Sequence, residues 1–179
     1  MTRETLSCDL MVIGSGYAGM AAALFAKDAG LEVVQAGAVG GIDFSSGFVD
    51  LMGVHPLAEG RSWDDPWAAI RAAVSDIPEH PYALTPARDI RLALSRFTGF
   101  LAESGLAFRG HEDRNVKMMT SVGSIKRTYR VPESMWAGVR ALENKAPCLL
   151  VSFHGLKGYS SRQIQETLSP NWPGLKDVR

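Results

Sequence analysis

The fold of this chain is decided by residues 9–20, Asp9-Leu10-Met11-Val12-Ile13-Gly14-Ser15-Gly16-Tyr17-Ala18-Gly19-Met20. An apolar run passes into glycines at the spacing G-x-G-x-x-G, at Gly14, Gly16 and Gly19, and then into small and apolar residues. This pattern predicts a buried strand, a tight turn and a helix. In a dinucleotide-binding turn, the first glycine allows the sharp bend, the second lets a phosphate approach the backbone, and the third lets the helix pack closely on the strand.

The start of the expected helix is a natural site for an anion. Its unpaired N–H groups face a bound phosphate, and the helix dipole adds a favourable charge. We therefore expect a phosphate-bearing cofactor at Gly14, Ser15, Gly16, Tyr17, Ala18 and Gly19. A tight strand–helix turn without any ligand is the alternative that the glycine spacing alone leaves open.

The composition is that of an ordinary folded domain. The 179 residues are enough for one domain with its own core. Lysine plus arginine equals aspartate plus glutamate, at 19 each, so the charge gives no reason to expect nucleic acid. Cys8 and Cys148 adjoin apolar runs and lack the spacing of a metal site or a disulfide framework, so no metal is expected. The chain has no signal peptide and no apolar run of about 18 residues, which predicts a cytoplasmic protein without a membrane span.

The residues after the helix bear on the identity of the cofactor. Residues 31–35 predict a second strand, parallel to the first through a right-handed crossover. A dinucleotide fold usually ends this strand with an acid that binds the ribose hydroxyls, but here the strand runs into Gln35-Ala36-Gly37-Ala38. The missing acid argues against NAD, and the lack of a basic residue at 35–38 argues against the 2′-phosphate of NADP. The missing acid argues in the same way against any cofactor that carries adenosine and leaves room for a mononucleotide such as FMN, so that FMN and FAD both stay open.

A second glycine-rich segment follows at Gly40-Gly41 and Ser45-Ser46-Gly47. Such backbone can approach a flat ring closely, and two serine hydroxyls can meet ring nitrogens or carbonyl oxygens. The segment follows the second strand, where ligands bind in open α/β sheets. We therefore assign Gly40, Gly41, Ser45, Ser46 and Gly47 to a flavin site, with a flexible serine–glycine loop as the structural alternative.

These segments carry a family resemblance that extends from about residue 9 to about residue 168. The matching motifs are GSGYAG at 14–19, GG-x-x-x-SSG at 40–47, Asp50-Leu51, His80-Pro81-Tyr82, Glu103-Ser104-Gly105 and GSIKRT at 123–128. With them the chain resembles the B subunit of anaerobic glycerol-3-phosphate dehydrogenase. The first fifty residues also resemble flavoproteins of the fumarate reductase type, with Ser-Ser-Gly in place of Ser-Gly-Gly.

The resemblance implies a flavoprotein, with FAD or FMN as cofactor. It implies oxidation of a small phosphorylated substrate, sn-glycerol 3-phosphate, to dihydroxyacetone phosphate, with electrons passed towards quinone. It also implies two partners, a catalytic subunit and an iron–sulfur subunit that anchors the complex, so that the chain would be peripheral to the inner membrane.

The expected architecture is α/β. Residues 1–55 and 145–179 are assigned to a Rossmann-like flavin-binding domain with a parallel sheet, and residues 56–144 to an inserted α+β substructure. The insertion is expected to contain a helix near Asp65 that stops before Pro78, and a longer helix capped by Thr85.

Strands at 116–120 and 124–131 are expected to form a hairpin within the insertion. Its cations, Lys126, Arg127 and Arg130, suit either a solvated face or a site for a phosphate or a neighbouring subunit.

The last part of the chain predicts a central parallel strand at 148–153, beside the first strand. The tail, residues 169–179, shows no pattern of a closing strand. Because members of the resembled family are much longer, we expect a truncated N-terminal portion with an incomplete flavin site.

The sequence assigns no catalytic residue, because His55, His80, His111 and His154 are scattered along the chain. Flavin chemistry is carried by the cofactor, so this gap does not argue against an oxidoreductase. Three functions stay open: a flavin-binding oxidoreductase subunit, an NAD(P)-binding module, and an electron-relay or assembly subunit without its own catalytic site.

Overall fold

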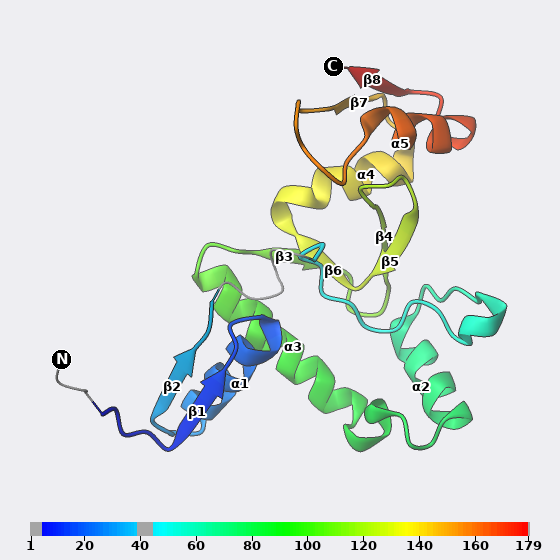
Figure 1. Cartoon of the computed structure of the whole chain (residues 1–179). Coiled ribbons are helices and arrows are strands. Elements are labelled where there is room, and N and C mark those ends of the chain that lie inside the picture. The colour runs from blue at the N-terminus through cyan, green and yellow to red at the C-terminus, as the bar shows by residue number, and fades with distance from the viewer. Residues whose placement is uncertain (1–4, 39–44, 179) are drawn as a thin grey trace. The chain divides into compact units, whose positions relative to one another are not determined.

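The computed structural model describes residues 5–38 and 45–178 (Figure 1). The chain divides into two compact units, residues 1–47 and residues 48–179, and each is described here by itself. Gly40 and Gly41 lie outside the described residues.

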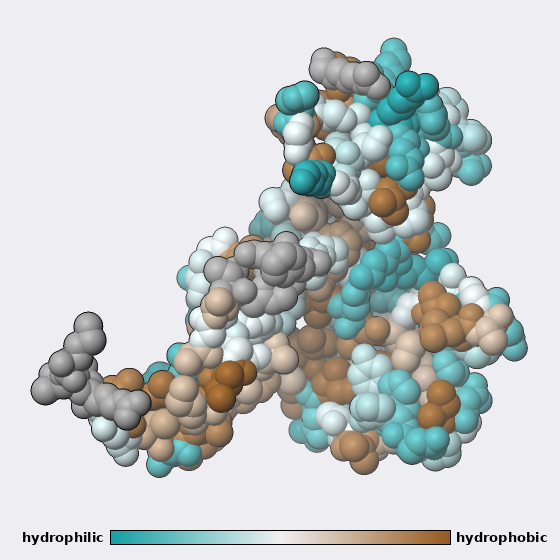
Figure 2. Space-filling view, in the orientation of Figure 1, coloured by the Kyte–Doolittle hydropathy of each residue, from teal (hydrophilic) through white to brown (hydrophobic). Residues whose placement is uncertain are grey.

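The first unit is the expected strand–helix–strand. It consists of β1 (Leu10–Ile13), α1 (Tyr17–Asp28) and β2 (Val33–Ala36), with the two strands parallel. The Oδ2 atom of Asp9 accepts a hydrogen bond of 2.8 Å from the Glu32 N–H, which fixes the start of one strand against the other. Hydrophobic side chains cover much of this unit's surface in Figure 2, and Ile13 is 86% exposed.

The second unit combines helices with two-stranded sheets. Its α-helices are α2 (Pro66–Asp76), α3 (Ala87–Glu103), α4 (Trp136–Asn144) and α5 (Ser161–Leu168). Its strands are β3 (Phe108–Gly110), β4 (Val116–Met119), β5 (Ile125–Thr128), β6 (Arg130–Pro132), β7 (Cys148–Val151) and β8 (Leu175–Val178). Short 3-10 helices occur at η2 (Leu57–Glu59), η3 (Pro81–Leu84), η4 (Glu133–Met135) and η5 (Ser169–Asn171). β3 pairs with β6 and β4 with β5, both antiparallel, whereas β7 and β8 are parallel.

Three clusters of buried hydrophobic side chains hold the second unit together. One is formed by Trp67, Ile70 and Tyr129, and the next by Val116, Val131 and Val139. The third joins α4, β7, α5 and β8 through Leu142, Leu150, Ile164, Trp172 and Leu175. Each cluster draws on elements far apart in the sequence, which ties the short sheets into one body.

The two expected helices and the pairing of the hairpin are confirmed, but the predicted N-cap of the longer helix is wrong. Helix α2 begins after Asp65, as predicted, and β4 and β5 form the hairpin. Thr85 does not cap α3, because Pro86 stands at the N-cap position with an extended ψ of 141°. Thr85 instead follows the 3-10 helix η3, in the extended conformation that a residue before proline prefers.

Residues 124–131 are not one strand, contrary to the sequence prediction. The N–H groups of Tyr129 and Arg130 both donate to the Val49 carbonyl, at 3.1 and 3.0 Å. This bridge ends β5 at Thr128 and places Arg130 in β6, which pairs with β3 instead of β4.

The tail prediction was also wrong, because residues 175–178 form β8. Its partner is β7, and Cys148 lies opposite Leu175. Leu150 is buried whereas Leu149 is 63% exposed, so β7 has one covered face rather than the two of a central strand. Within the described residues, no helix is both long enough and apolar enough to cross a bilayer.

Candidate functional site

The glycine turn between β1 and α1 has the predicted form. Gly14 adopts a φ of +118°, which side-chain-bearing residues rarely tolerate. Its N–H donates to the Ala36 carbonyl at 2.8 Å, so the turn is tied to the end of β2. Gly16 is the N-cap of α1, and its carbonyl accepts the Met20 N–H at 2.9 Å.

Gly19 is required by packing. A Cβ atom at this position would lie 2.2 Å from the Gly14 carbonyl oxygen, which is far inside van der Waals contact. A side chain here would therefore force the helix away from the turn. The close approach predicted for the third glycine is confirmed.

The start of α1 leaves its N–H groups available. Among the described residues, no side chain caps this helix, and its first turn, which contains Tyr17 and Ala18, holds no acid. The first N–H groups of an α-helix have no partner inside the helix, and the dipole favours an anion there. The backbone at the turn therefore suits a phosphate or pyrophosphate group.

Two side chains fix the turn against the end of β2. The Nε2 atom of Gln35 donates to the Gly14 carbonyl at 2.7 Å, and the Ser15 hydroxyl donates to the Ala38 carbonyl. The amide nitrogen of Gln35 therefore stabilises the turn. A Cβ at Gly37 would lie 2.9 Å from the Ser15 nitrogen, so this glycine also belongs to the turn.

Sequence reasoning missed the role of Gly37, although a signal was present. Gly37 directly follows the second strand. Because this strand runs parallel to the first, its end lies beside the turn that follows the first strand.

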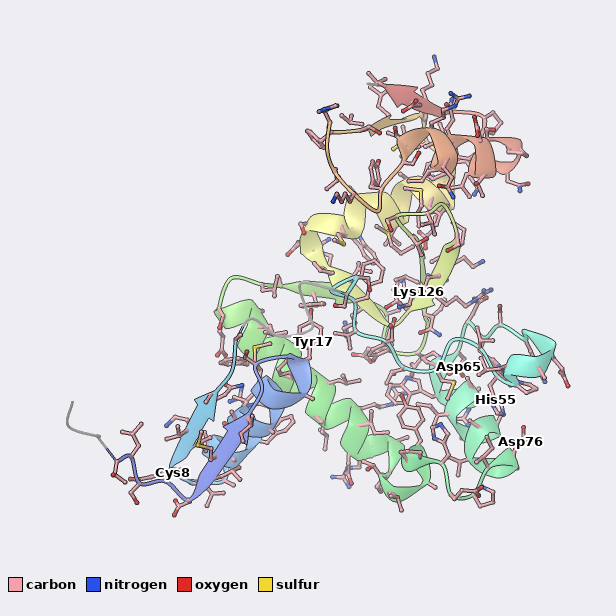
Figure 3. The ribbon with its side chains drawn as sticks, in the orientation of Figure 1. Cys8, Tyr17, His55, Asp65, Asp76 and Lys126 are labelled. Atoms are coloured by element: carbon pink, nitrogen blue, oxygen red, sulfur yellow. The ribbon has the colours of Figure 1, made fainter. Side chains whose placement is uncertain are left out.

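Tyr17 links the turn to the serine–glycine segment (Figure 3). Its hydroxyl donates to the Gly47 carbonyl at 2.9 Å, and the Gly47 N–H donates to the Ser45 hydroxyl oxygen at 3.2 Å. Burial raises the pKa of Tyr17 above its usual 10.0, so the hydroxyl keeps its proton at neutral pH. The structure thus brings Ser45 and Gly47 close to Tyr17 at the start of α1.

Three of the four histidines contact other residues of the protein. His55 is buried, and its Nε2 atom lies 2.9 Å from Oδ2 of Asp76. Both residues are labelled in Figure 3. The Nδ1 atom of His80 accepts the Tyr82 N–H at 3.1 Å. His111 contacts Arg114, and His154 is exposed. The described residues also contain no group of three potential metal ligands.

The cations of the hairpin are largely occupied by other protein groups. Lys126 pairs with Asp50 at 2.6 Å and Arg127 with Asp64 at 2.8 Å. Thr128, between them and Arg130, is 1% exposed, so this side of the hairpin is not the solvated face that alternation suggested.

Comparison with known proteins identifies the family. The model of the FAD binding domain matches residues 9–169. The chain belongs to this family of FAD-binding domains. The predicted flavin cofactor is thereby confirmed, with FAD as the family's ligand, and the α/β class is consistent with it. No solved structure matches the chain.

Curated relatives carry the name of the B subunit of anaerobic glycerol-3-phosphate dehydrogenase. Those of Actinobacillus succinogenes and Mannheimia succiniciproducens are 29% and 27% identical over 162 residues, which is 89% of this chain and 36% of each relative. That of Vibrio vulnificus strain YJ016 is 33% identical over 126 residues, 69% of this chain and 28% of the relative. The matched residues therefore span only 28–36% of the length of these relatives. The resemblance stated from the motifs is confirmed.

Proposed function

We propose that this chain supplies the FAD-binding turn of the B subunit of an anaerobic glycerol-3-phosphate dehydrogenase. The observation that carries the proposal is the turn itself, in which Gly19 has no room for a Cβ and the helix start is uncapped. The relatives' names point to the reaction, which we take to be oxidation of sn-glycerol 3-phosphate to dihydroxyacetone phosphate. Electrons would pass towards quinone through a catalytic subunit and an iron–sulfur anchor subunit, which would hold the complex at the inner membrane.

In this proposal the two glycine segments divide the cofactor between them. The backbone N–H groups of the first segment would hold the pyrophosphate; this segment consists of Gly14, Ser15, Gly16, Tyr17, Ala18 and Gly19. The second segment would hold the flavin ring, and it consists of Gly40, Gly41, Ser45, Ser46 and Gly47. Bound FAD supplies the redox chemistry by accepting a hydride, while the protein supplies binding and orientation. Tyr17 keeps the second segment beside the first through its bond to Gly47.

We also propose a division of the chain into a flavin-binding domain and an insertion. Residues 1–55 and 145–179 would belong to the flavin-binding domain, and residues 56–144 would be an insertion. The parallel pairing of β7 with β8 through α5 supports an α/β assignment for the last segment.

The assignment of FAD rests on the family match, because the end of β2 lacks the acid that usually binds the adenosine ribose of NAD and FAD alike. Residues 33–38 contain no acid for the ribose of NAD and no base for the phosphate of NADP. Gln35, which stands where the acid would be, has its amide nitrogen bonded to Gly14.

The decisive experiment identifies the cofactor of the full-length protein, purified with its partner subunits, by mass spectrometry. We expect stoichiometric FAD in the wild type and almost none in Gly16→Val, because a side chain there blocks the approach of the pyrophosphate. Gly99→Ala in α3 is the matched control, since a Cβ at Gly99 meets open space. Stoichiometric FAD in Gly16→Val would contradict the proposed site. A wild-type complex that assembles without flavin would favour an assembly role instead.

A further inference from the structure

The second unit contains a cavity of about 580 Å³ that the flavin site does not use. Its volume falls within the range of about 300–1,000 Å³ that is typical of small-molecule sites. The walls come from the segment before β4, from the β4–β5 hairpin, from α4, and from residues around α5 and η5. Every lining residue belongs to the second unit, so the cavity is a feature of one compact body.

The cavity carries an excess of positive charge. Four basic side chains line it, Arg114, Lys117, Arg127 and Lys145, against two carboxylates, Asp64 and Glu143. Asp64 is already paired with Arg127 at 2.8 Å. This leaves three cations facing one carboxylate.

Within residues 5–38 and 45–178, the three remaining cations have no carboxylate partner. Among the ion pairs of the described residues, none involves Arg114, Lys117 or Lys145. Arg114 bonds the ring of His111 at 3.0 Å, and the Nζ atom of Lys145 lies 5.4 Å from the centre of the Trp172 ring. Their charges are therefore available to an anion inside the cavity.

The positive charges of Arg114 and Lys117 both act on the carboxyl group of Asp64. The pKa of Asp64 is lowered from its usual 3.8, mainly by the hydrogen bond from Arg127, and the charges of Lys117 and Arg114 add to the effect. An anion near Asp64 would be stabilised by the same positive field.

The other walls suit a short carbon skeleton. Ile125, Leu142 and Leu168 supply apolar surface. Asn115 is 5% exposed, and its side-chain amide nitrogen donates to the carbonyls of Met52 and Trp63 at 3.0 and 3.1 Å. These bonds hold Asn115 in place in the wall of the cavity.

We propose that this cavity binds a small organic phosphate monoester, with the phosphate held by Arg114, Lys117 and Lys145. A phosphate monoester offers a compact double charge and three strong acceptor oxygens, which match three separate cationic donors. The site is distinct from the glycine turn, and it rests on the proposed function only for the choice of sn-glycerol 3-phosphate as a probe.

The test measures binding to the flavin-loaded full-length protein by isothermal titration at low salt. The probes are inorganic phosphate, sn-glycerol 3-phosphate, the uncharged alcohol glycerol, and succinate as a dianion without phosphorus. The variants are Lys117→Gln and Lys145→Gln, and Lys157→Gln is the matched control because Lys157 is exposed and does not line the cavity. FAD content and thermal unfolding are measured for each variant, so loss of the flavin site or of the fold is recognised separately.

We expect both phosphate probes to bind, glycerol not to bind, and sn-glycerol 3-phosphate to bind more tightly than phosphate alone. Each cavity variant should weaken binding of both phosphate probes about tenfold, the effect of losing one charged hydrogen bond, with Lys157→Gln unchanged. Equal affinity in wild type, Lys117→Gln and Lys145→Gln would overturn the proposal. So would succinate binding as tightly as sn-glycerol 3-phosphate, or no phosphate binding by protein with full FAD occupancy.

Discussion

The turn has room for the hydrogen atom of Gly19 but not for a side chain at this position. Gly19→Ala would place a methyl group 2.2 Å from the Gly14 carbonyl oxygen. We expect it to cost about 1–3 kcal/mol, the usual range for overpacking, and to lower FAD occupancy after purification. Gly99→Ala, a helical glycine with open space around it, should instead stabilise by about 0.5–1 kcal/mol. Urea unfolding of both variants measures the difference, and equal free energies of unfolding would count against this account of the turn.

Tyr17 contributes through one hydroxyl. Tyr17→Phe removes the donor to the Gly47 carbonyl and leaves the ring in place. We expect a loss of about 0.5–1.5 kcal/mol in FAD binding free energy, because the serine–glycine segment loses its tether. The effect should be constant from acid to mildly alkaline pH, since the pKa of Tyr17 is raised above 10.0 and the hydroxyl stays protonated. Titration of apoprotein with FAD measures it, and a steep pH dependence below 10.0 would argue against this role.

The carboxylate of Asp64 is expected to make the stability of the folded protein fall in acid. Its pKa is lowered below 3.8, first of all by the hydrogen bond from Arg127. A lowered carboxyl pKa contributes stability that is fully present above the unfolded value and is lost as pH falls through the folded value. The wild type should therefore melt at a higher temperature than Asp64→Asn near neutral pH, and the gap should close below 3.8. A gap that persists unchanged in acid would show that the charge of Asp64 is not its cause.

The residues of the turn differ in how far the sequence reveals them. Gly14, Gly16 and Gly19 follow a spacing set by local backbone geometry, so a single stretch of chain predicts them. The bonds from Gln35 to Gly14 and from Tyr17 to Gly47 join residues 21 and 30 positions apart. Such contacts depend on strand register and loop path, which the local pattern does not contain.

Helix α2 shows how a short sequence signal sets an element's start. The Oδ1 atom of Asp65 accepts from the N–H groups of Trp67 and Ala68 at 2.8 and 3.0 Å, and Pro66 occupies the first turn. Asp65→Ala should lower the free energy of unfolding by about 1 kcal/mol, the typical value of an N-cap. Thr85→Ala is the matched control, because no side chain caps α3. Equal losses in the two variants, measured in urea, would contradict this assignment.

The remaining boundaries show why elements are harder to predict than motifs. The end of β5 depends on Val49, a residue far away in sequence, which accepts from both Tyr129 and Arg130. Strand β8 is four residues long and follows a segment with two prolines, Pro170 and Pro173, so its sequence carries no strand pattern of its own. Leu175 and the nearby Trp172 are buried, and this tertiary packing supports the strand.

At the scale of the whole molecule, the hydrophobic core is distributed unevenly between the two units. All three buried clusters lie within residues 48–179. In the described part of residues 1–47, Val12 is the one buried hydrophobic side chain. A unit of this size with so little buried apolar surface cannot offset the conformational entropy lost on folding.

We therefore expect a fragment of residues 48–179 to unfold cooperatively on heating, and a fragment of residues 1–47 to show the circular dichroism of an unfolded chain. All four tryptophans lie in the larger fragment, so their fluorescence reports its melting directly. Ile164→Ala in that fragment should lower its free energy of unfolding by about 2–5 kcal/mol, because Ile164 is fully buried. A larger fragment that lacks a cooperative transition, while the intact chain has one, would mean that residues 1–47 are needed for its stability. The uneven core would then not determine how the chain folds.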